Sequence, residues 1–397
     1  MNSKELQKCG NEIKKIAIFT GSSLSYFGGG ERYVIELSNE LILRGFDVTI
    51  FTQNFSYTQN KSFSDVKKLT KAKIILYPIV PFPFIPTFPL FSRSMISKLN
   101  EANIIYNMDE SLFTNYLLYI YSKKRRIRYI YGMHIPLSFL FGNKAAKNKV
   151  NKMMWFFYRY VLRLFFRSKV QNIHILNEEQ YKNLKKIGYN GNIYKIDNFV
   201  REPGLPIEVT RNRDDENFIV IFSALMDVYS KGVDFLRDII VQTLENEPKI
   251  KFYITGGRGN ANNILSFIIE KYPKNVFYFG FLNEKELANL RNKALLFIST
   301  SRIEAFPLAI IETQMHGIPC IAFDIPGPSE IVRNEFQGKL IQPFDLNCFA
   351  ENIILFYKDW RDNKSRYLNN IKSIHDYTDR NFGKSVIIPK IIEMFNI

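Results

Sequence analysis

The stretch STSRIEAFPLAIIETQMHGIP, residues 299–319, decides how the second half of this chain folds. Glu304 and Glu312 stand eight positions apart, and every residue between them is apolar. Such a run predicts a helix docked on a sheet, and Pro307 suits its first turn because proline fixes φ and needs no amide hydrogen there. The preceding ALLFIST, residues 294–300, predicts a buried strand. We therefore expect Glu304 in the loop between strand and helix, and Glu312 inside the helix.

The same order of strand, loop and helix recurs in both halves of the chain. In the first half, KKIAIFT (14–20) precedes a glycine-ended loop and then the amphipathic ERYVIELSNELILRG (31–45). In the second half, FIVIFSAL (218–225) precedes a loop and then VDFLRDIIVQTLEN (233–246). Strands that alternate with helices favour parallel sheets covered on both faces. The sequence thus predicts an α/β protein.

The length of 397 residues exceeds what one hydrophobic core normally serves, so we expect two domains. REPGLPIEVTRNRDDEN, residues 201–217, is rich in proline, glycine and charge, which is typical of a linker. We expect a first domain at 1–200, a second at 201–378, and a C-terminal helix at 379–397 that crosses back to the first domain. If the two sheets face one another, the carboxyl ends of their strands form a shared ligand-binding cleft.

Composition indicates an anionic partner and no metal. Against 38 Asp and Glu the chain has 54 Lys and Arg, a net charge of +16. The three cysteines and four histidines are scattered without ligand spacing, so we expect no disulfide framework, metal or cofactor. We expect no nucleic-acid partner either, because no RRM, KH or helix-turn-helix signature is present. The polar segment 1–15 has no apolar core of a secretory signal, which predicts a cytoplasmic protein.

Two places offer backbone N–H groups to an anion. Gly28, Gly29 and Gly30 directly precede a helix, where free amides and the helix dipole favour phosphate, although a tight turn explains such a run equally well. The N–H groups of Phe306 and Leu308, at the start of the helix predicted after Pro307, can also bind phosphate. Glu304 and Glu312 can accept hydrogen bonds from hydroxyls. Phosphate beside hydroxyls describes a nucleotide sugar.

These residues resemble the retaining GT-B glycosyltransferases of glycosyltransferase family 4. The family's signature is a glutamate, seven residues and a second glutamate, in a frame like S-x-x-E-[GA]-F-[GP]-L, and residues 301–312 match it. Three further segments resemble the family in the same order: FGGGERYVIELSNELILRGFDVTIFT (27–52), SKGVDFL (230–236) and MHGIPCIAFDIPGPSEIV (315–332). The resemblance spans nearly the whole chain, and it implies two Rossmann-like domains facing across a cleft.

The resemblance also implies roles for individual residues. Glu304 would bind the hydroxyls of the donor sugar, Glu312 the ribose hydroxyls, and Lys231 the diphosphate. His134, in IYGMHIP, matches a histidine that the family carries near the donor sugar, although a lone histidine beside apolar residues is often structural. Glu304 and His134 are therefore the candidate catalytic residues.

One departure from the family pattern concerns the diphosphate. The family commonly has an arginine ahead of the lysine–glycine pair, where this chain has Ala224. A charge-assisted contact to phosphate contributes about 1.5–3 kcal/mol, so the donor binds more weakly or another cation substitutes. Arg258, in TGGRGN, is the candidate substitute.

Two segments of the first half bear on the acceptor. IILYPIVPFPFIPTFPLF (74–91) is apolar but contains five prolines, so it is not a spanning helix. KNKVNKMMWFFYRYVLRLFFRSK (147–169) predicts a helix with arginines four apart, and its basic and aromatic residues suit an anionic membrane interface, although core packing is the alternative. The residues concerned are Arg159, Arg163, Arg167, Trp155, Phe156 and Phe165.

The sequence therefore predicts a retaining glycosyltransferase on the inner face of the cell membrane. It would move a sugar from a nucleotide-sugar donor to a lipid-linked or glycan acceptor. Two other functions stay open: a nucleotide-sugar epimerase that shares the two-domain cleft, and a nucleotide-sugar-binding protein without turnover, with which Ala224 is consistent.

Overall fold

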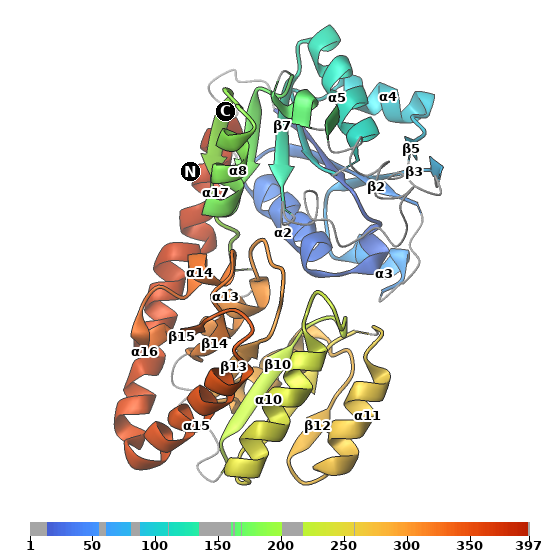
Figure 1. The fold of residues 1–397 in the computed structure, drawn as a ribbon. Coiled ribbons are helices and arrows are strands. Elements are labelled where there is room, and N and C mark those ends of the chain that lie inside the picture. Colours follow the sequence, from blue (N-terminus) through green and yellow to red (C-terminus); the bar gives the residue numbers. More distant parts are fainter. Residues whose placement is uncertain are drawn as a thin grey trace. The chain divides into compact units, whose positions relative to one another are not determined.

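Two parallel sheets, one in each of two units, carry the fold (Figure 1). The computed structural model describes residues 14–54, 61–80, 88–109, 111–134, 160–161, 163–167, 169–200, 217–257 and 259–395. The first unit comprises Met1–Asp197 and Ile388–Ile397, and the second comprises Asn198–Ile387. Arg258, residues 147–159 of the predicted aromatic helix and nearly all of the predicted linker lie outside the described residues.

The first unit contains a seven-stranded sheet of order β3-β2-β1-β6-β7-β8-β9, in which every neighbouring pair is parallel. Its strands are β1 (Lys15–Thr20), β2 (Asp47–Gln53), β3 (Lys73–Tyr77), β6 (Ile104–Met108), β7 (Arg128–Met133), β8 (Asn172–Ile175) and β9 (Asn192–Lys195). A short antiparallel pair, β4 (Ile79–Val80) and β5 (Phe88–Pro89), lies apart from this sheet.

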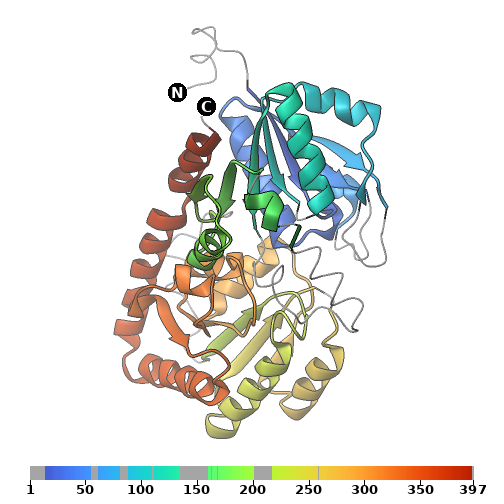
Figure 2. The ribbon, with the colours of Figure 1, turned by 45° about the horizontal axis from the view of Figure 1, so that its top comes forward.

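Helices connect these strands, as the alternating pattern predicts. They are η2 (Leu24–Tyr26), α2 (Gly29–Leu43), α3 (Phe63–Lys68), α4 (Arg93–Asn100), α5 (Leu112–Arg125) and α8 (Glu178–Lys186). Figure 2 shows α5 in teal beside α4 in light blue, where the hydroxyl of Tyr121 on α5 donates to the Ile96 carbonyl of α4. The helix α2 buries Val34, Leu37 and Leu41 at helical spacing.

The second unit contains a six-stranded parallel sheet of order β12-β11-β10-β13-β14-β15. Its strands are β10 (Ile219–Ser223), β11 (Lys251–Thr255), β12 (Val276–Tyr278), β13 (Leu296–Ser299), β14 (Cys320–Phe323) and β15 (Gly338–Ile341). Its helices are α10 (Val233–Asn246), α11 (Asn262–Lys271), α12 (Glu284–Lys293), α13 (Leu308–Gln314), α14 (Pro328–Ile331), η4 (Glu335–Gln337), α15 (Leu346–Asp362) and α16 (Lys364–Phe382). The last helix, α17 (Lys384–Phe395), begins in the second unit and ends in the first.

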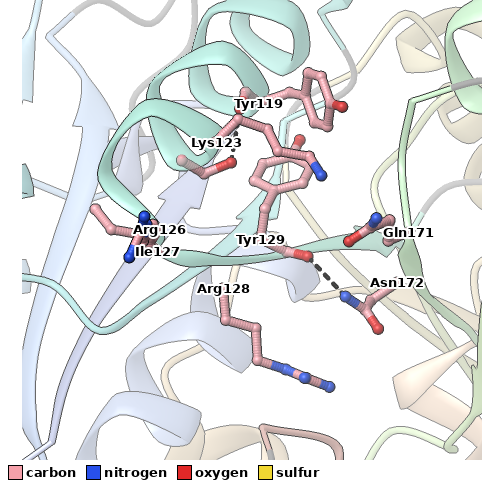
Figure 3. A pocket seen from close by; sticks show the side chains of 9 residues that line it. Tyr119, Lys123, Arg126, Ile127, Arg128, Tyr129, Gln171 and Asn172 are labelled. Carbon is pink, nitrogen blue, oxygen red and sulfur yellow. Dashed lines mark hydrogen bonds between the residues drawn. The ribbon is translucent and has the colours of Figure 1, made fainter.

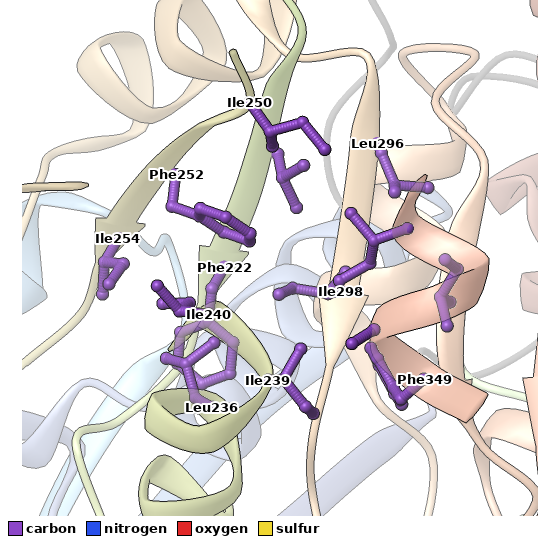
Figure 4. Packing of buried hydrophobic residues seen from close by; sticks show 14 of the residues in the cluster. Phe222, Leu236, Ile239, Ile240, Ile250, Phe252, Ile254, Leu296, Ile298 and Phe349 are labelled. Atoms are coloured by element: carbon purple, nitrogen blue, oxygen red, sulfur yellow. The ribbon is translucent and has the colours of Figure 1, made fainter. Parts of the chain in front are cut away.

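The core of the second unit lies between its sheet and the layer of α10, α11 and α15. Figure 4 shows α10 facing Phe222 and Phe252 of the strands through Leu236 and Ile240. All four side chains are at most 2% exposed, and full burial of a side chain of this size contributes about 1.5–3 kcal/mol. This packing fixes the sheet whose strand ends carry the candidate site.

Candidate functional site

The second sheet has its switch point between β10 and β13, because β11 lies on one side of β10 and β13 on the other. In open α/β sheets, ligands bind beyond the carboxyl ends of the strands at such a point. The loops that leave these two strands, 224–232 and 300–307, contain three of the predicted site residues, Lys231, Glu304 and Phe306. They are therefore the candidate site of the second unit.

Lys231 and Glu304 meet across these two loops. The Lys231 ammonium donates to Glu304 Oε1 at 2.6 Å, and the Ser301 hydroxyl donates to the same oxygen at 2.9 Å. The two charged side chains are 25% and 13% exposed, so the pair is partly shielded from water but open to a ligand. An ammonium has three N–H donors, which lets Lys231 hold this carboxylate and an anionic ligand together.

The loop that carries Glu304 is tied to the start of α10. The Thr300 hydroxyl donates to the carbonyl oxygens of Lys231 and Gly232 at 2.9 and 3.0 Å. Gly232 has a φ of 62°, and a Cβ there would run into the carbonyl oxygen of Thr300, so only glycine fits. This close approach explains why a glycine follows Lys231.

Arg302 joins the same two loops through hydrogen bonds. No pattern in the sequence indicated this role. Its guanidinium donates to both carboxylate oxygens of Asp234 at 2.8 and 2.6 Å, and to the Val228 carbonyl at 2.9 Å. It also stacks over the Phe235 ring, with Cζ 3.5 Å from the ring centroid. Bidentate pairs of this kind fix geometry as well as charge, so Arg302 positions the loop around Glu304.

The helix α13 begins one residue later than predicted, with Pro307 at its N-cap. The Phe306 side chain is buried against Phe382, with ring centroids 5.8 Å apart, so only its backbone can meet a ligand. The first N–H groups of a helix have no acceptor within it, which leaves the amide of Leu308 for a cap or a ligand. Gly327 packs closely against this loop, since a Cβ on it would lie 3.1 Å from the Glu304 Cβ.

Glu312 lies inside α13, as predicted, but it is deeply buried. Its Oε2 accepts from Arg291 Nη2 of α12 at 2.7 Å, and the two side chains are 4% and 1% exposed. A buried ion pair is stable only as a pair, because either charge alone would lack compensation. Arg291 is a second residue that the sequence analysis did not identify.

The loop of Ala224 adjoins the loop predicted to supply a substitute cation. The Ala224 amide donates to the Thr255 carbonyl at 3.1 Å, and the Met226 amide donates to the Gly257 carbonyl at 3.2 Å. A Cβ at Gly256 would meet the carbonyl oxygen of Ala224, so the two loops touch through their backbones. Thr255, Gly256 and Gly257 thus contact the position where the family's arginine is missing.

In the first unit, the start of α2 presents Gly29 and Gly30 to solvent. Neither has a positive φ, and a Cβ on Gly30 would meet no described atom within 4 Å. Neither a positive φ nor, at Gly30, close packing therefore requires a glycine here. The N-cap Gly28 donates to Glu31 Oε2 at 2.9 Å, and burial raises the pKa of that carboxyl.

His134 follows β7 at the carboxyl edge of the first sheet. Its Nε2 is 2.7 Å from the Tyr106 hydroxyl, and the Tyr33 ring lies 5.1 Å from its own between centroids. Burial and the neighbouring His174 hold the pKa of His134 well below its ordinary value. The ring is therefore neutral at physiological pH.

A pocket of about 380 Å³ opens at the opposite end of the same sheet, near the first residues of β7 and β8 (Figure 3). Lys123, Arg126 and Arg128 give it a basic lining. The Arg128 guanidinium also donates to the Met394 carbonyl of α17 at 3.0 Å. This pocket belongs to the amino end of the strands, away from His134 and the start of α2.

The described ranges contain neither a cluster of metal ligands nor a helix that could span a membrane. No three His, Cys, Asp or Glu side chains in these ranges gather closely enough to hold a metal ion. Among the helices in the same ranges, none combines the length and apolar character needed to cross a bilayer.

Two curated relatives are similar to this chain. Poly(ribitol-phosphate) alpha-N-acetylglucosaminyltransferase of Staphylococcus aureus is 27% identical over 191 residues, 47% of this chain and 37% of that protein. One of the subunits of human phosphatidylinositol N-acetylglucosaminyltransferase is 23% identical over 344 residues, 82% of this chain and 65% of that protein. The chain thus spans between a third and two thirds of these relatives' lengths.

The fold and the family are shown by broader matches. The solved structure of Anabaena HepE in complex with UDP has a TM-score of 0.71 at 16% identity, and the match covers 97% of this chain and 100% of that one. Residues 27–201 match the family Glycosyltransferase Family 4, and residues 207–373 match the family Glycosyl transferases group 1. One glycosyltransferase family model covers most of the first unit and another covers most of the second. The chain therefore belongs to the glycosyltransferases of the GT-B fold.

Proposed function

We propose that this chain transfers a sugar from a nucleotide-sugar donor to an acceptor hydroxyl with retention of configuration. The Lys231–Glu304 pair at the switch point of the second sheet carries this proposal. In the reaction, the acceptor oxygen bonds to the anomeric carbon while the bond from that carbon to the diphosphate oxygen breaks. The proton of the acceptor hydroxyl leaves with the diphosphate, on the face of the sugar that the acceptor attacks.

Each residue of the site has a role that its chemistry supports. The ammonium of Lys231 and the amides of Phe306 and Leu308 stabilise the negative charge that develops on the leaving diphosphate. Glu304 accepts hydrogen bonds from the sugar hydroxyls, and Glu312 accepts them from the ribose. A metal ion is not needed in this scheme, since the lysine and the amides supply the positive charge.

In the first unit, the exposed amides of Gly29 and Gly30 are assigned to a phosphate of the donor. His134 is assigned to the donor sugar. Arg258 is assigned to the diphosphate in place of the family's arginine, because residues 255–257, which precede it in the sequence, adjoin the loop of Ala224.

The first donor to test is UDP-N-acetylglucosamine. Both curated relatives are named N-acetylglucosaminyltransferases, and the structure of HepE contains UDP. The names of the two relatives also point to a polyol-phosphate glycan and to a phosphoinositide lipid as acceptors, so the acceptor proposed here is a glycan or a lipid-linked saccharide.

A thermal-unfolding panel of nucleotide sugars tests the donor. A ligand that binds only the folded protein at a hundred times its Kd adds about 2.7 kcal/mol of stability, so UDP-N-acetylglucosamine is expected to raise the Tm of the second unit clearly. ADP- and GDP-sugars serve as controls for the base, and UDP-glucose for the sugar. The donor assignment is wrong if no nucleotide sugar in the panel changes the Tm.

A turnover assay with the stabilising donor separates the three candidate functions. A glycosyltransferase forms product only when an acceptor hydroxyl is present. An epimerase changes the donor with no acceptor, and a binding protein without turnover leaves it intact. Either of the last two results contradicts the proposed transfer.

The acceptor is proposed to lie on the inner face of the cell membrane, whose anionic lipids attract this basic chain. Arg163 and Arg167 are exposed on a helical segment, and residues 123–126 at the end of α5 are four exposed basic side chains. For Phe165 the alternative of core packing holds, because its ring is 5% exposed and packs on Tyr119. Trp155, Phe156 and Arg159 lie outside the described residues.

Sedimentation with anionic vesicles tests the membrane proposal. Each basic residue near such a surface contributes about 1 kcal/mol, so Arg163→Gln with Arg167→Gln is expected to weaken binding about 30-fold. Lys274→Gln with Lys285→Gln removes the same charge from exposed positions of the second unit and serves as the matched control. Equal binding by the two double variants, or wild-type protein that stays in the supernatant at low salt, contradicts this role of the helix.

A further inference from the structure

A row of hydrogen-bonded rings crosses the carboxyl half of the first sheet. The Tyr106 hydroxyl on β6 is 2.7 Å from His134 Nε2, just past β7, and 2.6 Å from His174 Nδ1 on β8. On the far side of the row, His174 Nε2 is 2.8 Å from the Ile196 carbonyl oxygen, just past β9. Tyr106 and His174 are fully buried. We call His134, Tyr106, His174 and the Ile196 carbonyl the Tyr106 network.

Gly132 makes this row possible. It lies on β7, the strand between Tyr106 and His174, and its register partner on β8 is His174. A Cβ on Gly132 would lie 2.8 Å from the ring and hydroxyl atoms of Tyr106. The missing side chain therefore gives the phenol a path across β7, which is a positional reason for a glycine inside a buried strand.

The network has only one consistent arrangement of protons. The Ile196 carbonyl can only accept, so His174 Nε2 carries a hydrogen. Burial lowers the pKa of His174 to about 4, so this ring is neutral near pH 7 and its Nδ1 has a lone pair. Tyr106 has one hydrogen and donates it to that lone pair.

In the hydrogen bond between Tyr106 and His134, the tyrosine oxygen is then the acceptor. With its hydrogen committed to His174, the Tyr106 oxygen accepts from His134 Nε2–H. The neutral His134 ring holds its single hydrogen on Nε2, and its Nδ1 is left as an acceptor. No hydrogen bond to this Nδ1 is present within the described ranges of the chain.

We propose that Tyr106 and His174 are positioning residues that hold His134 as the Nε2–H tautomer, so that Nδ1 accepts a hydrogen bond from a sugar hydroxyl. The assignment to a sugar rests on the proposed function, whereas the tautomer does not. A lone pair recognises a hydroxyl and repels a phosphate oxygen, so His134 contributes to selection of the sugar and not to binding of the nucleotide.

Nuclear magnetic resonance of the histidine rings tests the tautomer without any activity. Only four histidines are present, so nitrogen-15 histidine labelling gives a simple spectrum in which His134→Gln identifies one set of signals. At pH 7 the wild type is expected to show His134 as the Nε2–H form. His174→Phe removes the acceptor of Tyr106, which then donates to His134 Nε2 and converts that ring to the Nδ1–H form. A wild-type Nδ1–H ring, or no change in His174→Phe, overturns the proposal.

Binding measurements test the hydroxyl contact. Tyr106→Phe is expected to weaken the contribution of the sugar to the binding affinity of the donor. The ratio of the affinity for UDP-N-acetylglucosamine to the affinity for UDP is expected to fall about five- to tenfold, while the affinity for UDP itself stays the same. Tyr129→Phe is the matched control, because it removes another buried strand hydroxyl, which donates to Asn115 and accepts from Asn107. An equal loss for both ligands indicates a structural role only and overturns the contact.

The two measurements also separate failure of this proposal from failure of the proposed function. If no nucleotide sugar binds, the assignment to a sugar falls together with the glycosyltransferase proposal, while the ring spectra still decide the tautomer. If UDP-N-acetylglucosamine binds but its ratio to UDP is unchanged in Tyr106→Phe, only the hydroxyl contact fails.

Discussion

Lys231→Ala is expected to lower kcat for sugar transfer by about two to three orders of magnitude, the usual effect of removing one preorganised donor to a developing negative charge. The Lys231 ammonium lies at the switch point of the second sheet, and its position is fixed by Gly232 and by the Thr300 hydroxyl. Steady-state kinetics with the donor found in the thermal panel measure the effect. Lys274→Ala, at an exposed position of the same unit, is the matched control and is expected to be neutral.

The hydrogen bond between Lys231 and Glu304 needs its own control, because removing either partner releases the other. Glu304→Gln keeps the shape of the side chain and leaves Lys231 in place. If the lysine acts on the diphosphate, Glu304→Gln lowers kcat with little change in UDP affinity, whereas Lys231→Ala weakens UDP as well. Wild-type kinetics in both variants would show that this pair is not the site.

Arg291→Met is expected to destabilise the second unit by about 3–5 kcal/mol, because it leaves the carboxylate of Glu312 buried without its partner. For a unit of this size, each kcal/mol lowers Tm by about 2–4 °C, so the expected loss of Tm is about 6–20 °C. The double variant Arg291→Met with Glu312→Gln removes both charges and is expected to recover most of this stability. Differential scanning calorimetry decides between these outcomes, and equal Tm values for wild type and Arg291→Met would contradict the buried pair.

The same double variant tests the proposed role of Glu312 in ribose binding. Because its fold is expected to be stable, a weaker affinity for UDP can be attributed to the lost carboxylate rather than to unfolding. Unchanged UDP affinity would indicate that Glu312 serves only the packing of α13 against α12.

Local patterns in the sequence predicted the elements well. The apolar spacing of 233–246 matches the bounds of α10, and the order of strand, loop and helix indicated two parallel sheets. Glu304 lies in a loop and Glu312 in a helix, as the stretch 299–319 predicts. These features depend on neighbours a few residues away, which a periodic pattern records.

Partners that are distant in sequence could not be predicted in the same way. Arg302 and Asp234 are 68 residues apart, and Arg291 and Glu312 are 21 apart on different helices. Nothing in the local pattern indicates that these charges meet, because the sheet order that brings them together is a property of the whole unit. The two alternatives for Phe165 have a related cause, since an aromatic helix face suits a membrane and a protein core equally well.

His174 shows the same limit for polar residues. The four histidines lack ligand spacing, so nothing in the sequence connects His174 with His134. The connection runs through a tyrosine from a third strand and needs a glycine on the strand between them.

The division of the chain also sets an order of events during translation. Residues Ile388–Ile397 complete the first unit. About 190 residues, all of the second unit, lie between Asp197 and this segment in the sequence. At about 5–20 residues per second, the ribosome needs roughly 10–40 s to bridge this interval. During that time the nascent first unit lacks the end of α17, including the carbonyl of Met394 that accepts from Arg128. The second unit, encoded without interruption, is the first of the two whose residues have all been made.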